Sequence, residues 1–153
     1  MQARCGDTLL LSLSQIDREH WELIAEGNEF AGAVEAGASR AELEIRLTRL
    51  IQGFQSHFQF EEGLMRVNGF PGLERHSAEH RKLIGQICEL RDDLESGLVQ
   101  LCETPAGFVR LWTEQHITGP DACCAEFLQE TGTGRETRLF TVLREPDGNT
   151  SSL

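Results

Sequence analysis

The sequence predicts an all-α fold, an antiparallel up-and-down bundle of four helices with an N-terminal arm and a short C-terminal extension. Apolar residues recur every three to four positions along four successive segments, as on the buried face of an amphipathic helix. Short breaks rich in Gly, Pro, Ser and Asn separate these segments, and short connections favour antiparallel neighbours. All five histidines fall on the apolar stripes or beside them.

A chain of 153 residues has the length of one domain. We assign residues 1–14 to the arm, 15–131 to the bundle and 132–153 to the extension, which we expect to be partly disordered. The formal net charge of −11 argues against nucleic acid and anionic membranes as partners. No apolar run approaches the roughly 18 residues that a membrane span needs. We therefore expect a cytoplasmic protein.

The first predicted helix begins near Ile16 and ends near Gly37, and its apolar stripe contains His20. The second begins after Ser39, because Ser39 followed by Glu42 is the pattern of a capping box. The stripe of the second helix combines apolar residues with a histidine and a glutamate: Leu43, Leu47, Leu50, Phe54, His57, Glu61 and Leu64.

The third predicted helix follows a break at residues 68–72 and ends near Gly97. Its stripe contains two histidines: Leu73, His76, His80, Leu83, Ile87, Leu90 and Leu94. The fourth begins with Thr104 as N-cap and Pro105 at the first helical position. The predicted inward face of this fourth helix contains Phe108, Leu111, Trp112, His116, Phe127 and Leu128.

Seven side chains on these stripes can bind metal ions. Residues four apart on a helix project from one face, and two pairs of the seven have this spacing. One zinc ion takes four ligands, and calcium and magnesium prefer oxygen. Seven mostly nitrogen donors therefore fit two ions of iron, copper or zinc. The set is His20, His57, Glu61, His76, His80, His116 and Asp121.

Burial supports a metal at these positions. Glu61 and Asp121 would lie on core stripes, where an unpaired carboxylate is costly and a bound cation removes the cost. A single histidine on such a stripe is more often a hydrogen-bonded core residue, but here no histidine is left for the surface. Of the neighbours Glu61 and Glu62, we expect only Glu61 to point inward, with Glu62 on a solvated face.

Asp121 follows His116 by five residues, which in a regular α-helix turns it about 140° away from the face of His116. Gly119 and Pro120 lie between them. Proline lacks the helical N–H and crowds the carbonyl four residues earlier. We therefore expect a bulge or kink that returns Asp121 to the face of His116.

Five motifs stand at the predicted ligands: IDREH at 16–20, HFQFEEGLM at 57–65, FP at 70–71, HSAEH at 76–80 and WTEQHITGPD at 112–121. Together they resemble the hemerythrins, most closely the bacterial hemerythrin-like group, over about residues 10–130. The resemblance implies two iron ions joined by an oxo or hydroxo bridge. It implies three histidines on one iron, His76, His80 and His116, and two on the other, His20 and His57. It implies that the bridging carboxylates are Glu61 and Asp121.

The resemblance further implies reversible binding of dioxygen, held as hydroperoxide at the open position of the iron with two histidines. This favours an oxygen carrier, storage or delivery protein over an enzyme, although weak peroxidase-type activity is compatible with the site. The alternatives are an oxygen or redox sensor acting through a partner, or a diiron enzyme that handles peroxide or nitric oxide. Azide, nitric oxide and peroxide are further expected ligands. We expect a monomer or a weak homo-oligomer.

An apolar wall would protect the bound oxygen from water and protons. The candidates are Phe54, Phe58, Trp112, Thr113 and Ile117. Each could equally be ordinary core packing. Many relatives carry leucine where this chain has Thr113, so we expect a wetter pocket and faster autoxidation.

The chain also departs from its relatives after the aspartate, where Ala122, Cys123 and Cys124 replace a basic and an aromatic residue. Five cysteines without a CxxC pair indicate reduced thiols. Packing is the favoured role of Cys123 and Cys124, and redox sensing is the alternative.

Overall fold

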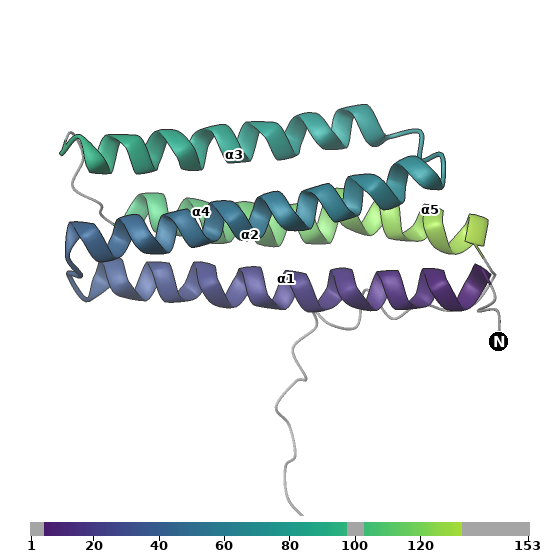
Figure 1. Ribbon diagram of the computed structural model, residues 1–153, viewed down its shortest axis with the longest axis horizontal. Coiled ribbons are helices and arrows are strands. Elements are labelled where there is room, and N and C mark those ends of the chain that lie inside the picture. Colours follow the sequence, from purple (N-terminus) through teal and green to yellow (C-terminus); the bar gives the residue numbers. More distant parts are fainter. Residues whose placement is uncertain (1–4, 98–102, 133–153) are drawn as a thin grey trace, which may run out of the picture.

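The computed structural model describes residues 5–97 and 103–132. The elements are α1 (Cys5–Glu35), α2 (Arg40–Val67), α3 (Leu73–Glu95), α4 (Glu103–His116), the π-helix η1 (Ile117–Asp121) and α5 (Ala122–Gly132). Helices α4 and α5 continue one another through η1 and form the fourth rod, so the chain runs up and down the bundle (Figure 1). The predicted all-α four-helix bundle is confirmed. Among the described residues, no helix is both long enough and apolar enough to cross a membrane.

The helix ends follow local sequence signals. The Oγ atom of Ser39 accepts a hydrogen bond from the backbone N–H of Glu42 at 3.2 Å, as the capping-box pattern predicted. Gly37 and Gly97 have φ angles of 70° and 69°. Glycine adopts this left-handed conformation without a Cβ clash, and it ends the helices close to the predicted positions. Helix α4 begins at Glu103, one residue before the predicted N-cap.

The first helix is longer than its apolar pattern suggested. Helix α1 begins at Cys5, so residues 5–14 of the expected arm continue the first helix of the bundle. Leu13 is buried in a small core cluster with Met65, Cys124 and Leu128. The predicted extension beyond Gly132 lies outside the described residues.

The larger core cluster fills the opposite part of the bundle, with Phe30, Leu50, Phe54 and Leu83 among its members. The predicted ligands lie between the two clusters. Along α2, His57 and Glu61 come after Phe54 of the larger cluster and before Met65 of the smaller one. Apolar packing on both sides therefore encloses a polar layer.

The predicted stripe of α4 is wrong at two positions. Phe108 and Leu111 are 38% and 53% exposed, whereas Val109 and Thr113 are 0% and 4% exposed. Val109, Thr113 and His116 are separated by four and three residues and share one face, while Leu111 points about 200° away from Val109. The sequence analysis assigned the larger side chains Phe108 and Leu111 to the buried face, but the smaller Val109 and Thr113 occupy it.

Candidate metal centre

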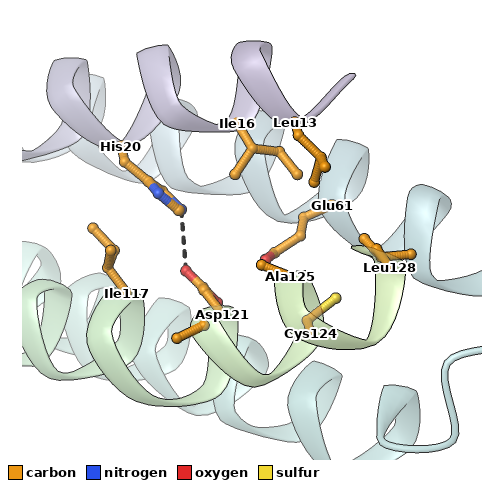
Figure 2. Close-up of a pocket in the computed structure, with 10 residues that line it drawn as sticks. Leu13, Ile16, His20, Glu61, Ile117, Asp121, Cys124, Ala125 and Leu128 are labelled. Carbon is orange, nitrogen blue, oxygen red and sulfur yellow. Dashed lines mark ion pairs between the residues drawn. The ribbon is translucent and has the colours of Figure 1, made fainter. Parts of the chain in front are cut away.

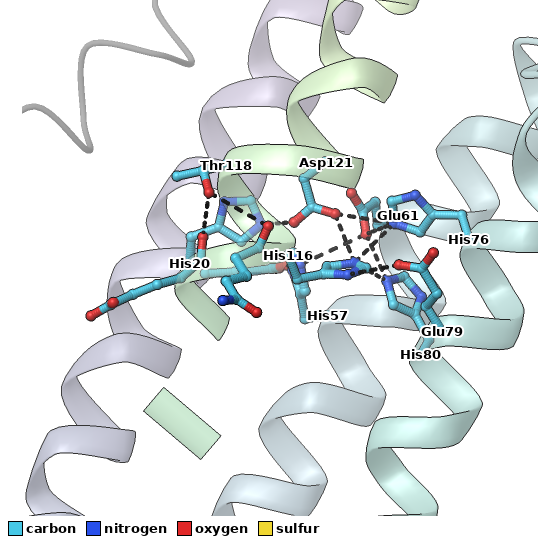
Figure 3. Close-up of polar contacts among 12 residues, drawn as sticks. His20, His57, Glu61, His76, Glu79, His80, His116, Thr118 and Asp121 are labelled. Atoms are coloured by element: carbon cyan, nitrogen blue, oxygen red, sulfur yellow. Dashed lines mark hydrogen bonds and ion pairs between the residues drawn. The ribbon is translucent and has the colours of Figure 1, made fainter. Parts of the chain in front are cut away.

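All seven predicted ligands lie together inside the bundle, each at most 6% exposed (Figure 3). They come from all four rods and form two groups of converging donor atoms. The five-ligand group consists of Glu61, His76, His80, His116 and Asp121. The three-ligand group consists of His20, His57 and Asp121. Asp121 belongs to both groups.

Three imidazole nitrogens converge in the five-ligand group. The Nε2 atom of His116 lies 2.9 Å from Nε2 of His80 and 3.1 Å from Nε2 of His76. Two ligands at right angles on a metal with bonds of about 2.1 Å would lie about 3.0 Å apart. The Oε2 atom of Glu61 lies 3.4 Å from Nε2 of both His76 and His80. These separations fit one shared cation.

The carboxylate of Asp121 faces both groups. Its Oδ1 atom lies 2.9 Å from Nε2 of His116 and 3.0 Å from Nε2 of His76. Its Oδ2 atom lies 3.0 Å from Nε2 of His20. Glu61 approaches the three-ligand group less closely, with Oε2 3.9 Å from Nε2 of His57.

Four buried donor or acceptor atoms have no hydrogen-bond partner among the described residues: His20 Nε2, Glu61 Oε2, Asp121 Oδ1 and Asp121 Oδ2. The close contacts of these atoms are thus not aligned as hydrogen bonds. Unpaired polar atoms are rare in protein interiors because burying them is costly. All four atoms belong to the two groups, where bound cations would satisfy them. The residues present therefore fit metal ions.

The π-helix η1 brings Asp121 to the site. It contains Thr118 and Pro120, and the Oγ1 atom of Thr118 donates a hydrogen bond to the backbone carbonyl of Glu114 at 2.7 Å. A π-turn adds one residue to the turn, so the fifth residue after His116 lies near the position that the fourth would occupy in an α-helix. This confirms the predicted bulge, and it explains how a spacing of five serves the same face.

Three further glutamates contact the outer ring nitrogens of the histidines. The pairs are Glu19 Oε2 with His57 Nδ1 at 2.8 Å, Glu62 Oε1 with His80 Nδ1 at 2.8 Å, and Glu79 Oε2 with His116 Nδ1 at 3.6 Å. A histidine that binds metal commonly donates its other N–H to a carboxylate, which orients the ring and raises its basicity. Such partners are therefore part of the candidate site.

The sequence reasoning missed these three glutamates. The expectation that Glu62 lies on a solvated face is wrong, because its side chain is only 21% exposed and contacts His80. A signal did exist, since each glutamate stands beside a predicted ligand in the sequence. A neighbour in a helix points about 100° away from the ligand, toward an adjacent helix that can supply a second ligand.

The two buried carboxylates have opposite pKa shifts in the metal-free protein. Burial and the negative charge of Asp121 raise the pKa of Glu61. Burial also opposes the charge on Asp121, but the nearby imidazoles of His116, His20 and His76 outweigh it and hold the pKa of Asp121 well below its usual range.

Two of the histidines, His76 and His80, also have opposite pKa shifts. Burial alone would lower the pKa of His76, but contacts with Asp121 and Glu61 raise it to about 10. For His80, burial and the neighbouring His116 lower the pKa to about 2. At neutral pH the metal-free site therefore holds a charged His76 beside a neutral His80.

Three of the predicted wall residues form an aromatic cluster against the five-ligand group. The ring of Phe58 stacks on His80 with 3.6 Å between centroids, and Trp112 stacks on His116 at 4.3 Å. Phe54 meets Trp112 edge-on at 6.2 Å. These rings restrict the orientation of two imidazoles.

The other two wall candidates lie differently. Thr113 is buried, and its Oγ1 atom donates a hydrogen bond to the backbone carbonyl of Val109 at 2.8 Å. Ile117 is buried in η1 and lines a small cavity beside His20 and Asp121. Ile117 thus lies on the side of the three-ligand group (Figure 2).

The vicinal cysteines have different environments. Cys123 is exposed and Cys124 is buried, and both are free. Burial, followed by the charges of Glu61 and Asp121, raises the pKa of the Cys124 thiol. A protonated buried thiol is a poor nucleophile, which agrees with the packing role predicted for Cys124, whereas the exposed Cys123 does not pack in the core.

Comparison with known proteins adds an independent observation. The family model described as the Hemerythrin HHE cation binding domain matches residues 11–122. A bacteriohemerythrin of Methylococcus capsulatus is 33% identical over 86 residues, 56% of this chain and 66% of that protein. The match thus spans just under two thirds of that relative. A bacteriohemerythrin of Stenotrophomonas maltophilia is 27% identical over 120 residues, 78% of this chain and 77% of that protein. No solved structure matches the chain significantly.

Proposed function

Because the chain belongs to the hemerythrin family, we propose that it binds dioxygen reversibly at a diiron centre and serves as an oxygen carrier or store. One observation carries this proposal. Two converging ligand groups share Asp121, and one of them has only three ligands where the other has five. A metal with few protein ligands keeps a position for a small molecule.

The proposed ligand assignment follows the two groups. One iron is held by three histidines, His76, His80 and His116, and the other by two, His20 and His57. Both carboxylates bridge, namely Glu61 and Asp121. The support for this assignment is that the two oxygens of Asp121 contact histidines of different groups and that Glu61 Oε2 is near histidines of both.

A pair of ferrous ions supplies the two electrons that reversible binding of dioxygen requires. The residues around them hold the ions, orient the imidazoles and exclude water. The proposed wall consists of Phe54, Phe58, Trp112, Thr113 and Ile117, all of them buried or half-buried. Exclusion of water and protons would protect the oxygenated state. The free cysteines are consistent with a reducing cytoplasm as the site of this function.

The visible absorption spectrum of the iron-loaded protein tests the proposal. It should be recorded after anaerobic reduction, after admission of air and after removal of the oxygen. We expect a colour that appears with oxygen and disappears without it, and a metal content of two irons per chain. The Asp121→Asn variant, which keeps the shape of the shared ligand but removes its charge, is the control and should lack the reversible colour.

A different outcome would favour the alternative functions. If air immediately produced a diferric spectrum that did not bleach on removal of oxygen, the oxygenated state would be too short-lived for storage. A redox sensor or a peroxidase would then be the better description.

A further inference from the structure

A hollow of about 310 Å³ lies on the surface between the start of α3 and the fourth rod. It shares no lining residue with the cavity beside Ile117. A water molecule occupies about 30 Å³ in the liquid, so the hollow has room for a small organic molecule. Its lining residues include four at the start of α3 and one on α5: Gly72, Arg75, His76, Glu79 and Cys123.

His76 lines this hollow with a buried ring, one nitrogen of which has no partner. Its Nε2 atom faces the metal ligands and lies 3.0 Å from Oδ1 of Asp121. No described residue bonds to its Nδ1 atom, whereas His80 and His116 each have a glutamate at Nδ1. The side chain of His76 is only 4% exposed. Yet its Nδ1 is not one of the four fully buried unpartnered atoms, so it can be reached from the hollow.

A metal ion on Nε2 makes the outer nitrogen a donor. A neutral imidazole with Nε2 bound to metal carries its proton on Nδ1, and an N–H group can only donate. Metal-binding histidines commonly donate this N–H to a carboxylate, as His80 does to Glu62. The hollow therefore presents, beside His76, a hydrogen-bond donor for an acceptor from outside the chain.

The start of α3 presents two further donors. Gly72 is the N-cap residue and makes no side-chain cap hydrogen bond. The backbone N–H groups of Glu74 and Arg75, which a cap side chain would bind, have no partner in the described part of the chain. A Cβ at Gly72 would lie 2.7 Å from the ring of Phe70, so a residue with its own capping oxygen would have to displace that ring. Free N–H groups at a helix start favour an anion.

The charged side chains of the hollow leave donors free for such an anion. Glu79 is already paired, because its Oε1 atom lies 3.7 Å from Nε of Arg75 and its Oε2 atom lies 3.6 Å from Nδ1 of His116. The side chain of Arg75 is 90% exposed and meets Glu79 through Nε. The other N–H groups of the guanidinium can bind a second carboxylate, whose planar shape they match.

We propose that this hollow binds a small carboxylate. One of its oxygens accepts the hydrogen bond of His76 Nδ1–H, the other accepts those of the free N–H groups at the start of α3, and Arg75 adds a positive charge. The ligand thus takes at His76 the place that Glu62 takes at His80. The proposal requires a metal ion at the site but not reversible oxygenation, so it does not rest on the proposed function.

Nuclear magnetic resonance of the zinc-loaded protein, with acetate as the probe, tests the binding. We expect saturable shifts of His76 Nδ1–H and of the backbone amides of Glu74 and Arg75. Acetamide, which has nearly the same shape without the charge, should cause no saturable shift. Arg75→Gln should weaken acetate binding about fivefold. Arg81→Gln is the matched control, because Arg81 is an exposed arginine of α3 outside the hollow, and it should leave binding unchanged.

The exposed thiol of Cys123 provides a second test, because it lines the hollow. Iodoacetate and iodoacetamide both alkylate a thiolate, forming an S–C bond and releasing iodide, but only iodoacetate carries a carboxylate. We expect the ratio of the iodoacetate rate to the iodoacetamide rate to be about fivefold higher at Cys123 than at Cys88, a half-buried thiol of α3 outside the hollow. Acetate and Arg75→Gln should both lower this ratio at Cys123. Mass spectrometry of peptides separates the two cysteines.

Four outcomes would overturn the proposal. Absence of saturable shifts with acetate would leave water as the occupant of the hollow. Shifts centred on His20 and His57 would place the acetate on a metal ion instead. Tighter binding of inorganic phosphate at the same resonances would show that the ligand class is wrong, and equal rate ratios at the two cysteines would contradict a carboxylate site. If the iron protein showed no reversible oxygenation, the proposed function would fail, but these experiments would still decide whether the hollow binds a carboxylate.

Discussion

A histidine ligand has two ring nitrogens, and in this site the outer nitrogen matters as well as the inner one. His57 and His80 both place Nδ1 2.8 Å from a glutamate oxygen. Glu19 keeps its charge readily, because hydrogen bonds from His57 and Gln15 outweigh the effect of burial and lower its pKa. A charged carboxylate at the outer nitrogen makes the imidazole a stronger donor to a metal.

The Glu62→Gln variant tests this effect at a single residue. We expect its metal affinity to be about 10 to 100 times weaker than that of the wild type, because a neutral amide orients His80 but does not raise its basicity. Competition with a chromophoric chelator measures the affinity. Glu89→Gln on the exposed side of α3 is the matched control. Equal affinities of all three proteins would contradict the prediction.

The raised pKa of His76 predicts that metal binding depends on pH. At pH 7 the metal-free protein holds His76 protonated, since its pKa is about 10, and a metal ion must displace that proton. Affinity should therefore rise as pH increases from 7 toward 10, by about tenfold per unit for one released proton. His80 is already neutral and adds nothing in this range. Calorimetry in buffers of different ionisation enthalpy counts the protons, and a count of zero at pH 8 would be incompatible with this account.

Under the proposed function, Thr113 should shorten the lifetime of the oxygenated protein. Its hydroxyl donates to the carbonyl of Val109, but the oxygen still brings a polar atom into a buried position. Thr113→Leu should slow autoxidation, measured as the decay of the oxygenated spectrum. Thr113→Val, which keeps the shape and removes the hydroxyl, separates polarity from volume. If Thr113→Leu oxidises as fast as the wild type, a wetter pocket is not the cause.

At the scale of elements, the π-helix η1 allows both ligands of the fourth rod to point into the site. His57 and Glu61 use the regular spacing of four, whereas His116 and Asp121 reach one face with a spacing of five. The extra residue is absorbed within η1, so Cys124 and Leu128 of α5 still point into the core.

A pair of length variants tests this role of η1. Deleting Pro120 gives His116 and the aspartate the regular spacing of four in an α-helix, and we expect two metals per chain to be retained. Inserting one alanine after Gly119 turns the aspartate a further 100° or so, and we expect the second metal to be lost. Metal analysis of the purified proteins measures both. Two metals in the insertion variant would show that η1 does not set the position of Asp121.

The sequence predicted those parts of the fold and site that depend on the spacing of residues along a helix. Helix ends, inward histidines and the bulge at Pro120 follow from spacing and from the chemistry of single residues. The exposed Phe108 and Leu111 were wrongly placed, because two possible stripes on α4 shared Trp112 and His116. Glu62 was missed because its partner His80 lies on another helix, and contacts between helices do not appear in the periodicity of either.

The whole molecule is an apolar bundle, and the site is a layer of buried imidazoles and carboxylates that interrupts its core. Without a cation, the unpaired atoms of that layer oppose folding. With one, binding free energy becomes folding free energy. The bundle should therefore depend on its metals for much of its stability.

Removal of the metals should lower the melting temperature. A metal at about 1,000 times its dissociation constant adds about 4 kcal/mol to the free energy of unfolding, which for a domain of this size corresponds to roughly 10 °C or more. Thermal denaturation with and without a chelator measures the difference. The Asp121→Asn variant should show a smaller difference, and equal melting temperatures of the loaded and metal-free wild type would contradict the prediction.

The unequal size of the two ligand groups also sets an order of assembly. The five-ligand group should fill first, and in doing so it fixes the carboxylate of Asp121, whose second oxygen faces His20. Binding of the first ion should thus orient a ligand of the second ion. Under iron scarcity the protein should accumulate with a single ion, which has only half of the electrons needed for reversible oxygenation. Under the proposed function, the shared aspartate would then make oxygen binding a cooperative function of iron supply.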